Sequence, residues 1–436
     1  MNLEKIDTTS ENIFLQETKE WGIMLIVDFQ TESEEMVQRV NNILSAMTNL
    51  KESGSLYFSF FLNVQLGLLK KIVSLPDELK GKDEKLFYTA VFDNSNKVSH
   101  IKQYDLSKVS GMQKLFDMYI KGKPVKHNCL ITWGDGYVNS FFSRKDENKN
   151  IFKNELNDYL KQVLETETYD FFYNNFNSTD VSPDNKSFQF LKPFSKYNLS
   201  IFELKMAIER SLHKRFDVTF MQNCGMAYYQ TLITSSFFTN TLIASANRVK
   251  VDSFNFPDLI NNIKSSNKKI SPDELSNLII TMSDNTFYPF KLSNYFRFKM
   301  LINSLGSNFI TLLEIENKAE LIRSIRVECS DLAATTSFRI IELFQLCQKT
   351  LDRASDITTD LKKSCEDLIK FKNQNNWGDV SIFFPLSNDD FEGISLLTID
   401  QLDLNTISSQ GFLNKHIWDC FIQKYINKIA LQPAMQ

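Results

Sequence analysis

Apolar residues follow two different spacings along the first 260 positions. Short continuous apolar runs, which are typical of buried parallel strands, occupy 23–29, 57–64, 85–92, 129–133, 218–221 and 242–245. Apolar residues recur with the helical period in 32–50, 111–120, 148–164, 200–216 and 226–234, and a polar loop covers 174–198. Because segments of crossover length separate most of the strands, this pattern predicts an α/β fold with a mainly parallel sheet flanked by helices.

The pattern changes at about residue 257 and becomes mainly helical. A long helical run covers 312–351, a break follows at 373–378, and an apolar segment at 380–385 precedes a last helix over 413–429. We therefore expect two regions: an α/β domain over 19–260 and a mixed, mainly helical C-terminal region over 261–436.

Two turns follow directly after apolar strands, at 134–137 and at 222–226. In parallel sheets, ligands and catalytic groups collect just beyond the carboxyl ends of the strands. These two turns are therefore the predicted location of a functional site, and the second of them carries Cys224.

Composition and charge exclude several classes of protein. The 436 residues include 49 Lys plus Arg and 53 Asp plus Glu, a formal charge of −4 that gives no general attraction to nucleic acid. The first twenty residues contain charged side chains such as Glu4, Lys5 and Asp7, which predicts no secretory signal and a cytoplasmic protein. The most apolar stretch, 56–69, is shorter than the roughly 20 residues that span a bilayer, so no membrane helix is expected.

The cysteines and glycines indicate no cofactor. Six cysteines, at 129, 224, 329, 347, 365 and 420, lie far apart, which predicts neither a disulfide framework nor a zinc site. No phosphate-binding glycine loop and no alternating carboxylates of a calcium loop are present in the sequence. We therefore expect no nucleotide and no metal.

Several segments, in order from about residue 19 to 429, resemble a known family. Residues 21–28 are WGIMLIVD, 130–136 are LITWGDG and 216–226 are FDVTFMQNCGM. The shorter segments 242–245, 253–256, 380–385 and 418–425 follow. This series resembles the clostripain-like cysteine peptidases, with their strand ending in Trp-Asp-His-Gly and their nucleophile turn Asp-Ala-Cys-x-Met. The resemblance implies a caspase-like fold and a cysteine peptidase site.

The resemblance assigns roles to the residues of the two turns. Cys224 matches the nucleophile, Asp135 stands at the position of the family's histidine, and the amides near Gly136 and Cys224 would hold the oxyanion. A carboxylate beside a thiol disfavours the thiolate, whereas an imidazolium favours it. Asp135 is therefore expected to be a turn residue, or else a base whose pKa is raised by burial. Without the resemblance, Cys224 would be explained as a small buried apolar residue.

A second departure concerns the substrate pocket that the resemblance implies. Gln222 replaces the family's aspartate two residues before the nucleophile, which weakens recognition of a basic substrate side chain. Asp252 is the candidate to supply a carboxylate there, because an arginine side chain needs a charged partner when buried.

The other histidines do not replace the missing base. His127 precedes the strand whose far end carries Asp135, so a rise of about 3.3 Å per residue places it roughly 20 Å away. His100 and His416 lie in unrelated segments, and His213 precedes Lys214 and Arg215 in a charged surface pattern.

Two hypotheses follow. The first is a catalytically impaired homologue, a pseudopeptidase that binds a peptide or protein partner in the same groove. The second is an active cysteine endopeptidase that uses Cys224 and prefers basic residues. The sequence leaves open a third hypothesis, an aspartate engineered at 135 to silence an active enzyme, and it does not specify the oligomeric state.

Overall fold

The structure is a computed structural model, and it describes most of the chain. The described residues are 18–29, 34–48, 50, 56–92, 97–120, 124–134, 136–137, 140–141, 199–212, 214–250, 252–266, 269–284, 286–332, 340–386 and 417–430. Asp135, His213, His416 and the predicted elements at 148–164 and 174–198 lie outside this set.

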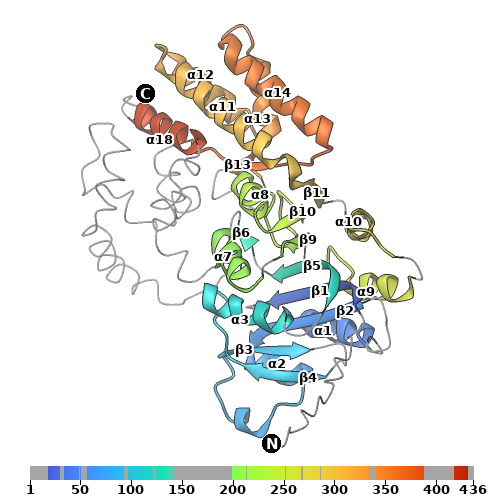
Figure 1. The fold of residues 1–436 in the computed structure, drawn as a ribbon. Helices are drawn as coiled ribbons and strands as arrows, with labels where there is room; N and C mark the ends of the chain where they lie inside the picture. Colours follow the sequence, from blue (N-terminus) through green and yellow to red (C-terminus); the bar gives the residue numbers. More distant parts are fainter. Residues whose placement is uncertain are drawn as a thin grey trace, which may run out of the picture.

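An eight-stranded sheet forms the centre of the molecule (Figure 1). Its strand order is β11-β10-β9-β5-β1-β2-β3-β4. The strands are β1 (Lys19–Asp28), β2 (Leu56–Gln65), β3 (Phe87–Phe92), β4 (Val98–Lys102), β5 (Val125–Gly134), β9 (Phe216–Gln222), β10 (Thr239–Ala244) and β11 (Tyr288–Lys291). The five strands from β10 to β2 pair in parallel, and β3, β4 and β11 pair antiparallel at the two ends. The predicted mainly parallel α/β sheet is confirmed.

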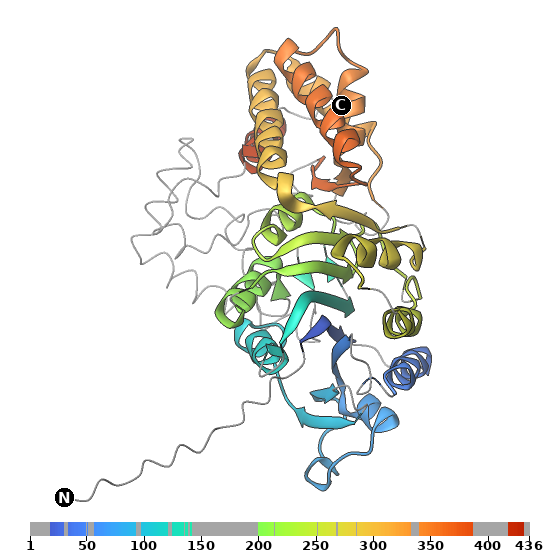
Figure 2. The ribbon, with the colours of Figure 1, turned by 45° about the vertical axis from the view of Figure 1, so that its right-hand side comes forward.

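The central strands contain continuous apolar runs because helices cover both faces of the sheet. In β1, every residue from Gly22 to Asp28 is buried. One face packs against α1 (Glu34–Ala46), α2 (Leu66–Ile72), α9 (Phe256–Ser265) and α10 (Pro272–Thr281). The other face packs against α3 (Val109–Ile120), α7 (Ile201–Ser211) and α8 (Tyr229–Ser235). Figure 2 shows α1 and α9 side by side on the first of these faces.

The C-terminal region is mainly helical, as predicted (Figure 1). It contains α11 (Tyr295–Glu314), α12 (Lys318–Val327), α13 (Leu343–Leu351), α14 (Thr359–Asn375), α18 (Ile417–Ala430) and the antiparallel pair β12 (Ile340–Glu342) and β13 (Ser381–Phe383). The single helical run predicted over 312–351 is wrong. Asn317, with a left-handed φ of 61°, separates α11 from α12, and β12 precedes α13.

Strand β13 connects this helical region to the turn after β9. The Ser381 N–H donates to the Ala227 carbonyl at 2.8 Å, and Tyr228 forms a parallel bridge with Ser381. A small three-stranded sheet, β6 (Gly136–Tyr137), β7 (Ser140–Phe141) and β8 (Leu199–Ser200), lies beside the end of β5. The predicted boundary at 260/261 falls within α9 and stays a prediction.

Candidate functional site

The two turns singled out in the sequence meet at the carboxyl edge of the sheet. Strands β5 and β9 are parallel neighbours, with Trp133 opposite Gln222 in the register. The turn that begins at Gly134 therefore lies next to the turn that carries Cys224. This placement follows from topology, because the carboxyl ends of neighbouring parallel strands share one edge.

Gly136 lies directly against the backbone of Cys224. A Cβ atom added at Gly136 would be 2.9 Å from the Cys224 nitrogen and 2.5 Å from the Asn223 Cβ. Ordinary side chains do not fit such a gap, so the close approach of the two turns requires glycine. The structure thus brings Gly136 and Cys224 together, and their role as an oxyanion site stays a prediction. Asp135, between Gly134 and Gly136 in sequence, lies outside the described residues.

Cys224 is partly exposed, and its sulfur contacts the loop that follows β10. The Val249 N–H donates to Cys224 Sγ at 3.3 Å, and Cys224 Sγ lies 3.7 Å from the Val249 carbonyl oxygen. Gly225 has a φ of 68°, a left-handed conformation that glycine adopts at little cost, and its N–H donates to the Asn247 carbonyl. The N–H donated to sulfur stabilises the thiolate, whereas the S–H donated to the Val249 carbonyl stabilises the thiol, so the two contacts act in opposite directions.

The Asn223 side chain links the two turns through hydrogen bonds. Thr132 Oγ1 donates to Asn223 Oδ1 at 2.7 Å, and Asn223 Nδ2 donates to the Gly134 carbonyl at 3.0 Å. Asn223 is fully buried, so these bonds satisfy an amide that would otherwise be costly in the interior. Sequence analysis missed this residue. The available signal was a polar amide between an apolar strand and a candidate nucleophile.

A second buried polar chain ends at the same edge. Asp28, the last residue of β1, is only 1% exposed and accepts a hydrogen bond from Asn63 Nδ2 at 2.6 Å. Thr89 Oγ1 in turn donates to Asn63 Oδ1 at 2.9 Å. Asp28 lies opposite Gly134 in the register, beside the turn that carries Asp135. Sequence analysis did not select Asp28, although a carboxylate that ends an apolar strand is a usable signal.

Gln222 and Asp252 lie near each other but have different surroundings. Gln222 is buried and its Nε2 donates to Ser253 Oγ at 3.3 Å. Asp252, the neighbour of Ser253, is exposed and lines a pocket of about 240 Å³. The segment 249–257 therefore runs from the Cys224 sulfur, past Gln222, to this pocket.

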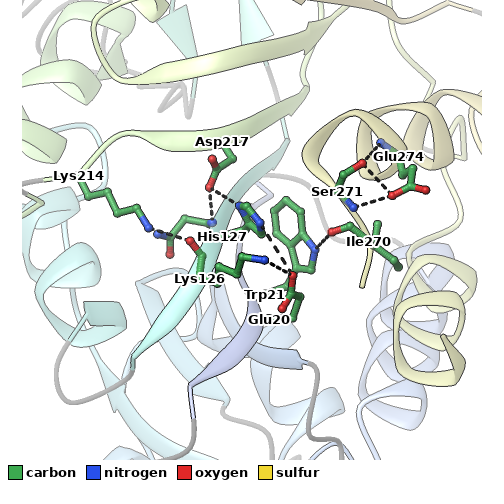
Figure 3. A network of polar contacts seen from close by, with 10 residues as sticks. Glu20, Trp21, Lys126, His127, Lys214, Asp217, Ile270, Ser271 and Glu274 are labelled. Carbon is green, nitrogen blue, oxygen red and sulfur yellow. Dashed lines mark hydrogen bonds and ion pairs between the residues drawn. The ribbon is translucent and has the colours of Figure 1, made fainter. Parts of the chain in front are cut away.

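His127 is the third residue of β5 and so lies at the opposite edge of the sheet from Cys224. Figure 3 shows its ring beside Asp217 and Trp21. Its ring lies between the Glu20 and Asp217 carboxylates, at 4.0 and 3.5 Å, and its centroid is 5.0 Å from that of Trp21. Asp217 also accepts the Asn128 N–H at 2.9 Å. The ring therefore belongs to a network at the amino edge.

The other described histidine is His100, on the edge strand β4, where its Nε2 lies 2.8 Å from the Tyr104 hydroxyl. Neither described histidine lies at the carboxyl edge. His213 and His416 lie outside the described residues.

Burial separates Cys224 from most of the other thiols. Burial raises the pKa of the Cys129 thiol well above its usual range, and it raises the pKa of Cys329 to about 11. A hydrogen bond with Cys365, together with burial, raises the pKa of the Cys347 thiol well above its usual range. In the described part of the chain, Cys224 and Cys420 are the cysteines that retain partial exposure. Reactive thiols are partly exposed and lie in electropositive surroundings, and Cys224 combines partial exposure with one N–H donor.

The described residues contain neither a cluster of metal ligands nor a membrane-spanning helix. Among them, no group of three or more His, Cys, Asp or Glu side chains is arranged to hold a metal ion. Within those same ranges, no helix has the length and apolar character needed to cross a bilayer.

Comparison with known proteins gives structural likeness only. No protein-family model and no curated protein matches the chain. Among solved structures, a secreted C11 cysteine protease from Bacteroides thetaiotaomicron has a TM-score of 0.49 at 8% identity, covering 84% of this chain and 88% of its own. An inactive zymogen C11 protease from Parabacteroides distasonis has a TM-score of 0.48 at 9% identity, covering 84% and 89%. The B. thetaiotaomicron protease in complex with an irreversible peptide inhibitor has a TM-score of 0.46 at 9% identity, covering 93% and 99%. The fold assignment given above rests on the strand order and register themselves.

Proposed function

We propose that this protein is a catalytically impaired homologue of the clostripain-like cysteine peptidases that binds a peptide or protein at the carboxyl edge of its sheet. One observation carries the proposal: the backbone of Gly136 contacts the backbone of Cys224. The turn after β5, which matches the family's histidine turn, therefore lies beside the turn that carries the thiol. The turn after β5 carries Asp135 instead of histidine. An aspartate cannot supply the imidazolium that favours the thiolate, which is the attacking form.

The location of His127 supports the same proposal. Its ring is held between two carboxylates at the amino edge, about a strand length from Cys224. Moving an imidazole to the thiol would require the sheet to come apart. The described part of the chain therefore offers no replacement for the family's histidine.

An active cysteine endopeptidase is the second candidate, and the Val249 N–H favours it. This donor lies 3.3 Å from Cys224 Sγ and stabilises negative charge on sulfur. In this mechanism the thiolate attacks a peptide carbonyl, and amides near Gly136 and Cys224 stabilise the oxyanion. Asp135 or another group moves the proton. The preference for basic residues would rest on Asp252, since Gln222 carries no charge.

The expected partner for both candidates is a peptide or protein. The sequence-based expectations of no nucleic-acid partner, no membrane partner and no cofactor remain part of the proposal. The first of them follows from the small net charge.

The reactivity of Cys224 separates the two candidates. Iodoacetamide labelling of each cysteine would be measured by peptide mass spectrometry across a pH series, with Cys224→Ser as the control. Cys329, with a pKa of about 11, serves as an internal reference for an unactivated buried thiol. Cleavage of arginine, lysine and neutral peptides would be assayed in parallel, in wild type and in Asp135→His.

We expect iodoacetamide to label Cys224 slowly at pH values below about 8.5, the ordinary pKa of a free cysteine. We also expect the wild type to cleave no peptide. Rapid labelling at neutral pH, together with cleavage that Cys224→Ser abolishes, would contradict the impaired-enzyme proposal and favour the second candidate. Cleavage that appears only in Asp135→His would identify the aspartate as the cause of inactivity.

A further inference from the structure

Two helices of the C-terminal region form a hairpin. Helix α13 ends at Leu351, α14 begins at Thr359, and the two pack against each other (Figure 1). Short connections place consecutive helices antiparallel, so residues at similar distances from the connection face each other. The Lys372 Nζ lies 4.7 Å from the centre of the Phe344 ring, near the open end of the hairpin, as this arrangement requires.

Each helix of the hairpin carries a cysteine within its buried face. Buried residues recur every three or four positions along both helices, which is the spacing of one helix face. Cys347 belongs to this face of α13 and Cys365 to that of α14, and neither is exposed to solvent. Ser364 Oγ, one residue earlier, lies 2.8 Å from Ser304 Oγ of α11. Helix α14 therefore contacts α11 with one side of its buried face and α13 with the other.

The two thiols contact each other across the hairpin. A hydrogen bond joins the side chains of Cys347 and Cys365. The sulfur atoms of Cys129, Cys224 and Cys329 contact backbone atoms instead. The pairing of the two thiols has no signature in the sequence, because it depends on how α13 packs against α14.

We propose that Cys347 and Cys365 form a disulfide under oxidising conditions, which closes the hairpin covalently and stabilises it. Both residues are free thiols in this structure, which therefore represents the reduced form. Contact between two thiols is the first requirement for such a bond. The second is an acceptor of two electrons, and the class that we name is a small disulfide such as oxidised glutathione.

The reaction is a pair of thiol–disulfide exchanges. One cysteine thiolate attacks a sulfur of oxidised glutathione, which forms a mixed disulfide and releases one glutathione thiolate. The other cysteine thiolate then attacks the protein sulfur of the mixed disulfide, so the second glutathione leaves and the bond between Cys347 and Cys365 forms. The two thiol protons pass to the two departing glutathione sulfurs. The protein is oxidised by two electrons, and one glutathione disulfide is reduced to two thiols.

Burial controls when this bond forms. The attacking species is the thiolate, and exchange also requires access to the sulfur. In the closed hairpin neither Cys347 nor Cys365 is accessible. The bond therefore forms when the hairpin opens or while the chain folds, and the same burial protects it from reduction afterwards.

The bond would act on the support of the candidate site. Helix α13 follows directly after β12, and β12 pairs with β13. The Ser381 N–H of β13 donates to the Ala227 carbonyl, three residues after Cys224. A link that encloses residues 348–364 restricts the unfolded chain and so stabilises the folded hairpin. This effect does not depend on the proposed function, because it is the same whether or not Cys224 is reactive.

Mass spectrometry of the full-length protein tests whether the bond forms. The protein would be held in a buffer of reduced and oxidised glutathione at urea concentrations from zero to beyond the unfolding midpoint. It would then be diluted and equilibrated in the same buffer without urea. Free thiols would be blocked with N-ethylmaleimide, and linked peptides identified without reduction. We expect Cys347–Cys365 to be the main internal link, and its yield to rise with urea because opening exposes the thiols.

Two results of that experiment would overturn the inference. One is the absence of the Cys347–Cys365 link at every urea concentration. The other is the formation of links between other cysteines in equal amounts, which would show that contact in the folded hairpin does not select the pair.

Thermal unfolding tests whether the bond stabilises the protein. We expect the oxidised wild type to have a Tm roughly 3–6 °C above that of the same sample reduced with dithiothreitol. The difference should vanish in Cys347→Ala and Cys365→Ala. It should persist in the matched control Cys329→Ala, which removes another buried thiol of the C-terminal region. Each comparison is made within one variant, so the cost of the substitution itself cancels. Equal Tm values for oxidised and reduced wild type, or a difference that persists in Cys365→Ala, would also overturn the inference.

Discussion

At the scale of single residues, Gly136 is the point where the two turns of the candidate site touch. The missing side chain allows its backbone to approach Asn223 and Cys224 within contact distance. Asn223 then holds the approach with hydrogen bonds to Thr132 and to the Gly134 carbonyl. The geometry around the sulfur therefore depends on one small residue and one buried amide.

Gly136→Ala tests this dependence. The new methyl group would overlap the Cys224 nitrogen, a backbone atom, and the Asn223 Cβ, the side-chain atom bonded directly to the backbone. We expect the free energy of unfolding to fall by about 1–3 kcal/mol, as overpacking typically costs, measured by urea denaturation. In the control Gly67→Ala, the nearest atoms are 3.3 Å away in the Glu84 side chain, and stability should stay within about 1 kcal/mol of wild type. An equal loss in both variants would refute the close-contact explanation.

At the scale of elements, the ends of helices and strands set the positions of the functional groups. Strands β5 and β9 end next to each other, and α9 begins where the pocket ends. In the C-terminal region, two asparagines with left-handed φ values mark helix ends: Asn317 before α12 and Asn376 after α14. Asparagine tolerates this conformation better than other non-glycine residues.

Asn376 ends α14 in a left-handed conformation, and substitutions there test the role of backbone strain. Its φ is 51° and its N–H caps the last turn of α14. We expect Asn376→Gly to be as stable as wild type or slightly more stable, and Asn376→Val to lose about 1–2 kcal/mol, by thermal and urea unfolding. Asn373→Val, at an exposed helical position of α14, is the matched control and should cost under about 1 kcal/mol. Equal losses at the two positions would exclude backbone strain as the cause.

The element scale also shows where sequence analysis was sufficient. Each of the five parallel strands was predicted as an apolar run, because strands buried on both faces need apolar residues at every position. The edge strand β4 was missed, since its half-exposed residues carry no such run. The segment 312–351, predicted as one helical run, contains several elements. The break at Asn317 was not predicted because a left-handed backbone conformation leaves no signal in the hydrophobic pattern.

At the scale of the whole molecule, one apolar core links the sheet to the C-terminal helices. It extends from Met24 of β1, through Leu232 of α8, to Ile426 of α18. Strand β13 adds a backbone connection, with the Ser381 N–H bonded to the Ala227 carbonyl three residues after Cys224. A continuous core couples the stability of its parts, so the helical region supports the turn that carries the thiol.

We expect the sheet and the C-terminal helices to unfold together in one cooperative transition. Trp21 reports on the α1 and α9 face of the sheet, and Trp418 reports on the C-terminal helices. In variants whose single remaining tryptophan is Trp21 or Trp418, with the other three replaced by phenylalanine, we expect the urea transitions by fluorescence to coincide with each other and with circular dichroism. The variant Ile382→Ala, in buried β13, should lower both midpoints together. Two separated transitions would show that 19–260 and 261–436 unfold independently.

The sequence by itself determined the fold class and the two turns of the candidate site. Local patterns suffice for these, because burial on two faces dictates apolar strands and strand ends dictate turn positions. Only the tertiary structure decided which residues meet there: Gly136 against Cys224, Asn223 between the turns, Asp28 beside Gly134, and a pocket that joins α1 to Asp252. These contacts join residues far apart in the chain, and register, strand order and helix packing create them only when the sheet is assembled.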